Sequence, residues 1–288
     1  MTSWWKNTLA TLEMIKWEHS IFALPFAFTG AVLAAKGWPD LRVLGWIVLC
    51  MVAARSSAMA FNRLVDADLD RANPRTSMRA LPAGQLSKGF VTGFVILSAG
   101  MFLFGAAMLN RLTLELAPFA LLILLAYSYM KRVTRWSHLV LGLALGIAPS
   151  AAWVAVRGVL DVRILVLTAA VLLWVAGFDV LYACQDFEHD REAGLNSVPQ
   201  SFGLENAFWV ARAMHVGMLA LLIWMDELFG LGRLALLGVA LVGALLLYEH
   251  SIISPRDLRR MNAAFFTLNG VISVVFFAFV AADVLLRR

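Results

Sequence analysis

Nine long apolar runs constrain what this chain can fold into more than any other feature of its sequence. Each run is near the length of about 20 residues that an α-helix needs to cross a bilayer. Only helices and closed barrels span lipid, and these runs are too continuously apolar for barrel strands. We therefore predict an all-α, polytopic membrane protein with nine transmembrane helices, at about residues 20–36, 43–62, 89–109, 113–130, 138–157, 162–184, 206–229, 231–253 and 263–286.

Composition and charge agree with this prediction. Of the 288 residues, 61% are hydrophobic and 15% are charged, whereas soluble domains are near half apolar and about a quarter charged. If the N-terminus is cytoplasmic, 14 of the 24 Lys and Arg residues fall on that side and 8 on the other, which follows the positive-inside rule. We expect an integral protein of a bacterial-type inner membrane, with the lipid bilayer as a partner. The net charge of +5 does not indicate nucleic-acid binding.

Two connecting loops are much longer than the rest, at about residues 63–88 and 185–205. They follow the second and the sixth predicted helix, so an even number of spans separates them and both face the cytoplasm. Internal repeats are common in membrane folds. We therefore predict one membrane-embedded domain over 1–288, built as two four-helix pseudo-repeats plus a ninth helix.

The first long loop begins with acids at helical spacing, in "NRLVDADLDRANPRTSMRALP". At about 100° per residue, Asn62, Asp66 and Asp70 fall within roughly 80° of arc on one helix face. Asp68 points elsewhere. The helix end thus presents one stripe of oxygen ligands.

The second long loop repeats the arrangement in "DVLYACQDFEHD". Asp179, Tyr182, Asp186 and Asp190 again share about 80° of arc, and Glu188 points to the opposite side. Two stripes with the same aspartate spacing, in equivalent positions, argue against a merely solvated acidic loop.

Such stripes are unfavourable alone, because like charges at i, i+4 repel and a helix C-terminus is already negative. Magnesium is commonly held by one or two carboxylates plus substrate phosphates. Arg75 and Arg79 are spaced to share a face and to bind a phosphate bidentately. We therefore predict a magnesium-dependent diphosphate site, and the side chains that we expect to ligate the metal are Asn62, Asp66, Asp70, Asp186 and Asp190.

These motifs resemble those of the UbiA family of intramembrane prenyltransferases. The family's first motif, N-x-x-x-D-x-x-x-D, matches "NRLVDADLD", and its second, D-x-x-x-D, matches "DFEHD". The family's Y-x-x-x-K element matches "YSYMK", with Tyr127 and Lys131. The chain departs from the family pattern at Arg63, where an aspartate is common, and at Ala80 in "RALP", where proline is common. The resemblance covers the whole chain, including "IKWEHSIFALPFAFTG".

The resemblance implies an enzyme that transfers a polyprenyl group from a polyprenyl diphosphate to a small aromatic acceptor in quinone biosynthesis. Magnesium would assist loss of diphosphate to give an allylic cation, and an electron-rich ring would be alkylated. Asp66, Asp70, Asp186 and Asp190 would be the catalytic acids. The chain is similar to the 4-hydroxybenzoate polyprenyltransferase branch and equally to enzymes that prenylate naphthoate-type menaquinone precursors.

Further substrate-binding residues follow from the resemblance and from position. Lys131, and Lys16 with His19 at the start of the first helix, would contact the diphosphate. Arg132 is adjacent to Lys131, so its side chain diverges by about 100° and would hold an acceptor carboxylate.

Asp179 and Tyr182 would orient the acceptor or another ligand. Arg55 lies two helical turns before Asn62 on nearly the same face, and an arginine that deep in a membrane is usually functional or paired. His138 has no metal-ligand spacing, and we expect it to be a core or interfacial residue.

Two other functions fit part of the pattern. A transporter also carries charged residues in its helices, but it needs a site near the midplane, whereas these acids cluster at helix ends on one side. Enzymes that farnesylate haem share the first motif, and the acceptor is therefore the least constrained part of the prediction.

Overall fold

The computed structural model describes residues 10–15, 23–261 and 267–287, and every regular element in those ranges is a helix. This confirms the all-α prediction. The helices are α2 (Leu24–Ala35), α3 (Leu41–Val65), α4 (Ala67–Ala72), α5 (Lys88–Leu109), α6 (Arg111–Val133), α7 (Ser137–Arg157), α8 (Ile164–Ala183), the 3₁₀ turn η2 (Cys184–Asp186), α9 (Phe187–Glu192), α10 (Val198–Phe202), α11 (Leu204–Phe229), α12 (Arg233–Ile252) and α14 (Asn269–Leu286).

Eight helices within the described residues are long and apolar enough to cross a membrane. They are α3, α5, α6, α7, α8 together with η2 and α9, α11, α12 and α14. The predicted count of nine is therefore not confirmed. The first predicted run corresponds to α2, whose 12 residues span about 18 Å at 1.5 Å per residue. Residues 16–22, which include the start of the first predicted run, lie outside the described ranges.

Polar caps set the starts of several long helices close to the predicted positions. The side chain of Asp40 accepts a hydrogen bond from the Arg42 amide at 2.7 Å at the start of α3. Ser87 and Asn110 cap α5 and α6 in the same way. Each cap satisfies one of the backbone N–H groups that a helix start leaves unpaired.

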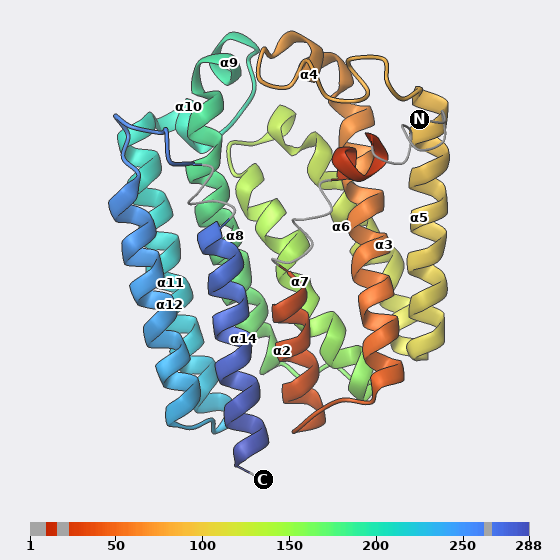
Figure 1. Ribbon diagram of the computed structural model, residues 1–288, viewed down its shortest axis with the longest axis vertical. Coiled ribbons are helices and arrows are strands. Elements are labelled where there is room, and N and C mark those ends of the chain that lie inside the picture. Colours follow the sequence, from red (N-terminus) through yellow and green to blue (C-terminus); the bar gives the residue numbers. More distant parts are fainter. Residues whose placement is uncertain (1–9, 16–22, 262–266, 288) are drawn as a thin grey trace.

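The long helices run side by side along one bundle, and the short helices α4, α9 and α10 lie together at one end (Figure 1). Each predicted acidic loop thus follows a long helix, α3 or α8, with a short helix at the same end of the bundle. This placement agrees with the expected repeat, although the repeat itself stays a prediction.

Small residues bring α7 and α8 close together. A Cβ on Gly142 would lie 2.4 Å from the carbonyl oxygen of Leu172, and one on Gly146 would lie 2.8 Å from that of Thr168. This is the close backbone approach that small residues four apart allow between membrane helices. Trp174 of α8 contacts Phe26 of α2, with ring centroids 5.0 Å apart, in the core.

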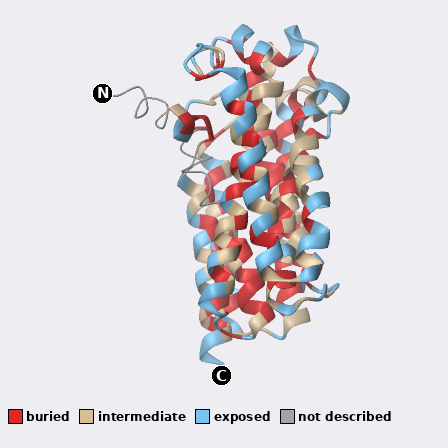
Figure 2. Ribbon diagram, turned by 90° about the vertical axis from the view of Figure 1, so that its right-hand side faces the viewer, coloured by how far each residue is buried: buried red, intermediate tan, exposed pale blue. Residues whose placement is uncertain are grey.

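Exposed residues follow the outer faces of the helices, and buried residues face the interior (Figure 2). Many of the exposed side chains are large and apolar, such as Phe119 on α6 and Leu247 on α12. A soluble monomer rarely exposes this much apolar surface. The outer surface of the bundle is therefore suited to lipid.

Candidate active site

A cavity of about 1010 Å³ opens between α3, α6, α7 and α8. Its polar end is lined by residues of both acidic motifs, among them Asp70 and Asp190. It extends to Leu109, at the end of α5, and to Leu165, near the start of α8, so apolar walls continue towards the opposite end of the bundle. The cavity therefore joins a charged end to a long apolar interior.

The first motif bends the chain at Asp66. α3 ends at Val65 and α4 begins at Ala67, so the three motif residues do not lie on one continuous helix as predicted. They still stay together, because the Asp66 amide donates to the Asn62 carbonyl oxygen at 2.9 Å and the Asp70 amide donates to that of Asp66 at 2.7 Å. The side chain of Asn62 also donates to Asp66 Oδ2 at 2.9 Å.

Helical phase correctly predicts the orientation of the acids outside each stripe. Asp68 is exposed and pairs with Arg71, and it does not line the cavity. Glu188 is exposed and pairs with Arg191. In the second motif the four residues predicted to share a face, Asp179, Tyr182, Asp186 and Asp190, all line the cavity, and His189 lines it as well.

Arg75 and Arg79 lie in a turn-rich segment and not on a shared helix face, so that expectation is wrong. Arg75 donates to both oxygens of Asp186, at 2.8 and 2.6 Å. Arg79 donates to Asp70 Oδ1 at 2.6 Å. With Arg71 on Asp68, each loop arginine thus balances an aspartate, and Arg75 ties the first loop to the second motif.

Two residues without a role predicted from the sequence also lie at this polar end. Arg63 is buried, with Nη1 3.7 Å from Asp70 Oδ2. The seven-residue spacing between Arg63 and Asp70 is the signal that could have indicated this pair, since residues seven apart share a helix face. Asn73 donates to Asp186 at 3.3 Å. This contact depends on the path of the loop after α4, so the sequence contains no signal for it.

Two motif oxygens without a hydrogen bond within the described residues fit a divalent cation. Oδ2 of Asp70 and Oδ2 of Asp190 are buried and accept no hydrogen bond within the described residues. Burial raises the pKa of the Asp66 carboxyl, against the opposing effect of the Arg132 guanidinium. A bound cation would stabilise the charged form of these acids.

No three His, Cys, Asp or Glu side chains in the described parts of the chain are placed to enclose a metal ion by themselves. A metal bound here would complete its coordination with other oxygen atoms, such as those of a bound phosphate. Magnesium typically binds in this way, with few protein carboxylates and with phosphate oxygens.

Tyr127 and Lys131 of α6 both line the cavity. Arg132 does not, and its guanidinium donates to Asp66 Oδ1 at 2.9 Å and to the carbonyl oxygens of Val65 and Ser128. The predicted divergence of Lys131 and Arg132 is thus observed, but Arg132 contacts the first motif and does not line the cavity.

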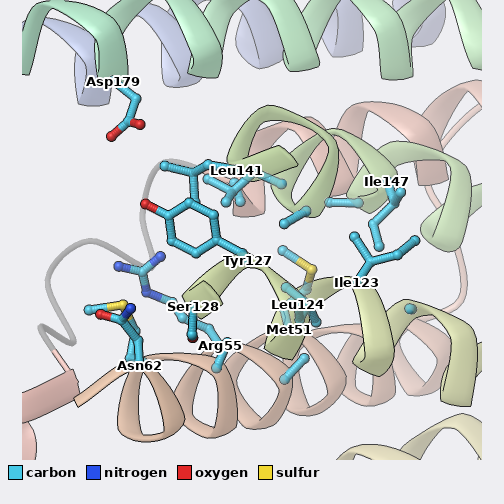
Figure 3. A pocket seen from close by; sticks show the side chains of 18 of the residues that line it. Met51, Arg55, Asn62, Ile123, Leu124, Tyr127, Ser128, Leu141, Ile147 and Asp179 are labelled. Carbon is cyan, nitrogen blue, oxygen red and sulfur yellow. The ribbon is translucent and has the colours of Figure 1, made fainter. Parts of the chain in front are cut away.

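Arg55 of α3 reaches into the cavity instead, close to Asn62 and Tyr127 (Figure 3). Its Nε is buried and has no hydrogen-bond partner among the described residues. Asp179 of α8 points into the same space from the opposite wall. Lys16 and His19, expected at the diphosphate, lie outside the described residues.

Comparison with known proteins settles the family. The sequence matches the UbiA prenyltransferase family over residues 23–271, most of its length. The chain belongs to this family. Over 244 residues it is 34% identical to the 4-hydroxybenzoate octaprenyltransferase of Vibrio cholerae, covering 83% of this chain and 84% of the relative.

Solved structures of UbiA homologues agree with the fold. The apo structure of a UbiA homolog from Aeropyrum pernix K1 superposes with a TM-score of 0.84 at 34% identity, over 93% of this chain and 98% of that one. A UbiA homolog from Archaeoglobus fulgidus bound to DMAPP and Mg²⁺ superposes at 0.76 with 22% identity, over 95% and 98% of the two chains.

Membership of the UbiA family confirms the expected resemblance and the expected class of enzyme, a membrane-embedded prenyltransferase. It supports the enzyme over the transporter. The position of the acids at one end of the bundle, rather than near its middle, is in accord with this outcome.

Proposed function

We propose that this UbiA-family protein transfers a polyprenyl group from a polyprenyl diphosphate to an aromatic acid of the 4-hydroxybenzoate type. The observation that carries the proposal is the cavity, which joins two aspartate motifs to a long apolar interior. A polyprenyl diphosphate has the same two parts, an anionic head and an apolar tail.

The residues of the polar end would bind the diphosphate head. Magnesium would be held by the motif oxygens of Asn62, Asp66, Asp70, Asp186 and Asp190, and when bound it supplies positive charge to the leaving diphosphate. Lys131 would donate to the phosphate oxygens from the end of α6. We expect Arg75 and Arg79 to exchange an aspartate oxygen for a phosphate oxygen when the diphosphate enters, because guanidinium groups bind phosphate bidentately.

The apolar walls would hold the tail and exclude water. Side chains such as Ile123, Leu124 and Ile147 line this part of the cavity (Figure 3). An allylic cation formed by loss of diphosphate reacts readily with water, so a water-poor site protects it until the ring attacks.

Two opposed charges favour an acceptor with its carboxylate and its hydroxyl at opposite ends. Arg55 would bind the carboxylate, since its Nε lacks a partner within the described residues and a planar guanidinium matches a carboxylate. Asp179 lies across the cavity and would accept a hydrogen bond from the hydroxyl. In 4-hydroxybenzoate these groups are para, whereas in a naphthoate-type precursor the carboxylate adjoins a hydroxyl.

The test is product analysis on the purified full-length protein with Mg²⁺ and geranyl diphosphate. Separate reactions contain 4-hydroxybenzoate, a dihydroxynaphthoate, haem or no acceptor, and the products are identified by mass spectrometry. We expect a geranylated 4-hydroxybenzoate that disappears when EDTA is added. A product formed only from the naphthoate or from haem would overturn the assignment of the acceptor, and no aromatic product at all would overturn the reaction.

We further propose that the protein lies in the inner membrane with this site facing the cytoplasm, as the distribution of Lys and Arg indicates. Cysteines introduced at the exposed positions Met78 and Val162 test the orientation. A membrane-impermeant thiol reagent added outside intact cells should label only the cysteine at 162. Labelling at 78 instead would show the opposite orientation.

A further inference from the structure

His138 at the start of α7 connects Asp179 to the loop that follows the second motif. Its ring is fully buried. Nδ1 lies 2.6 Å from Asp179 Oδ2 on α8. Nε2 accepts a hydrogen bond from the backbone amide of Val198, the first residue of α10, at 3.3 Å.

These two contacts fix the tautomer of the imidazole. A backbone N–H can only donate, so Nε2 must carry the lone pair and the ring proton must lie on Nδ1. His138 Nδ1–H therefore donates a hydrogen bond to Asp179 Oδ2. The arrangement holds the carboxylate in one orientation, as a backbone-fixed histidine does when it orients another functional group.

Asp179 is held by His138 and also faces the cavity. Its Oδ2 is bonded to His138, and the side chain lines the cavity, where a ligand can reach the carboxylate. Tyr127 of α6 lies beside it on the cavity wall (Figure 3). Asp179 precedes the first acid of the second motif by seven residues and is not one of the residues assigned to the metal.

We propose that Asp179 accepts the hydroxyl proton of the aromatic acceptor and that His138 is the positioning residue that holds Asp179 for this task. The inference rests on the proposed function, because it requires an acceptor ring that carries a hydroxyl group. It adds a proton acceptor to the reaction and gives a role to a histidine that would otherwise belong only to the core.

Each bond, electron pair and proton in this step can be followed. The C1–O bond of the donor breaks first, and the diphosphate leaves with the electron pair. The ring carbon next to the hydroxyl then forms its bond to C1 of the allylic cation. Asp179 takes the hydroxyl proton, and the ring becomes a dienone that carries a hydrogen on the alkylated carbon. That hydrogen then leaves as a proton to solvent or diphosphate, the ring regains aromaticity, and Asp179 returns its proton to the oxygen.

A matched set of full-length variants tests the proposal with Mg²⁺ and geranyl diphosphate. His138→Leu removes the donor, His138→Asn keeps an amide N–H near the position of Nδ1, and Asp179→Asn removes the base but keeps a hydrogen bond to His138. Each is assayed with 4-hydroxybenzoate and with 3-fluoro-4-hydroxybenzoate, whose hydroxyl is more acidic and depends less on a base.

We expect kcat for 4-hydroxybenzoate to fall roughly 10-fold or more in His138→Leu and roughly 100-fold in Asp179→Asn, the usual scale for a lost proton acceptor. The KM for geranyl diphosphate should stay unchanged, and His138→Asn should recover most of the loss. The ratio of kcat for the fluorinated to the plain acceptor should rise about threefold or more in both impaired variants, in line with Brønsted behaviour.

An unchanged ratio in Asp179→Asn would overturn the proposal, even if His138→Leu proved too unstable to purify. Wild-type kcat in a folded His138→Leu would overturn the positioning role. A wild-type protein that prenylates no aromatic acid would overturn the proposed function itself, and this inference with it. A wild-type protein that does so while the variants lose activity equally on both acceptors would overturn this inference alone.

Discussion

Asp66 and Asp68 are two residues apart and occupy different surroundings. Asp66 lines the cavity and bonds to Asn62 and Arg132, whereas Asp68 is exposed and pairs with Arg71. The difference follows from the turn of the helix, which carries residues two apart to different faces. The same phase separates Asp186 and Asp190 from the exposed Glu188.

We therefore expect Asp66→Ala and Asp186→Ala to lower kcat roughly 100-fold or more, because each removes oxygen ligands at the site of the leaving diphosphate. Asp68→Ala and Glu188→Ala are the matched controls and should stay within about threefold of wild type, since surface substitutions away from such features have small effects. The measurement is turnover per molecule of purified protein. A loss in Asp68→Ala as large as that in Asp66→Ala would contradict the assigned face.

Arg55 and Arg132 provide a second contrast between residues. We expect Arg55→Leu to raise the KM for 4-hydroxybenzoate roughly 10-fold or more, the scale of a lost hydrogen bond to a charged group, with little change for the donor. Arg132→Leu should mainly raise the concentrations of Mg²⁺ and of donor that give half-maximal activity, because Arg132 contacts Asp66. Initial rates measured at varied concentrations of each substrate and of Mg²⁺ separate these effects. An acceptor KM that changes only in Arg132→Leu would restore the role that the sequence alone suggested.

The elements that carry the site are two long helices, each followed by a bend and a short helix. The positions of α3 and α8 could be predicted from apolar runs, because the need to cross lipid sets their length. The break at Asp66 could not, because backbone hydrogen bonds continue across it and the motif spacing is that of an unbroken helix. The pairing of Arg75 with Asp186 depends on a turn-rich loop, which has no periodic pattern to predict.

Contacts between elements also explain why Arg132 lies beside Asp66 and not on the cavity wall. The angle between adjacent residues on α6 was enough to predict that Lys131 and Arg132 diverge. It could not tell which of them faces the cavity or what the other one meets, since this depends on how α6 packs against the end of α3. The lack of a hydrogen-bond partner for Arg55 Nε within the described residues likewise depends on how the helices around the cavity pack, so it could not be predicted from the sequence.

Arg75 offers a test at the scale of elements, because it ties the loop after α3 to the motif after α8. We expect Arg75→Ala to raise the Mg²⁺ concentration needed for half-maximal activity by roughly fivefold or more, since the lost bonds are charge-assisted. Arg71→Ala removes an exposed pair from the same loop and should have little effect. Magnesium titrations of activity make the comparison, and equal shifts in the two variants would contradict the cross-link.

The whole molecule is a bundle whose outer surface suits lipid and whose interior contains a cavity along much of its length. This shape suits a ligand with a charged head and an apolar tail, as proposed for the donor. The family and the reaction class follow from motifs that sequence alone contains. The division of the cavity between donor and acceptor does not, because it depends on side chains from four helices.

Ile147 tests how the cavity is used. It lies ten residues into α7, about 15 Å along the helix, and points into the cavity (Figure 3). Ile147→Trp should shorten the apolar part, so kcat/KM for a long polyprenyl diphosphate should fall roughly 10-fold or more while that for geranyl diphosphate changes little. Leu97→Trp, on an exposed position of α5, is the control. Equal losses for both donors would contradict the placement of the tail.

The central claim is that both aspartate motifs bind one diphosphate at the charged end of the cavity. The most direct measurement is an experimental structure with a thiodiphosphate analogue of the donor and Mn²⁺ in place of Mg²⁺, in which anomalous scattering locates the metal. We expect manganese between the diphosphate and the carboxylates of Asp66, Asp70, Asp186 and Asp190, with the prenyl chain in the apolar part of the cavity. Manganese and diphosphate bound away from either motif would contradict it.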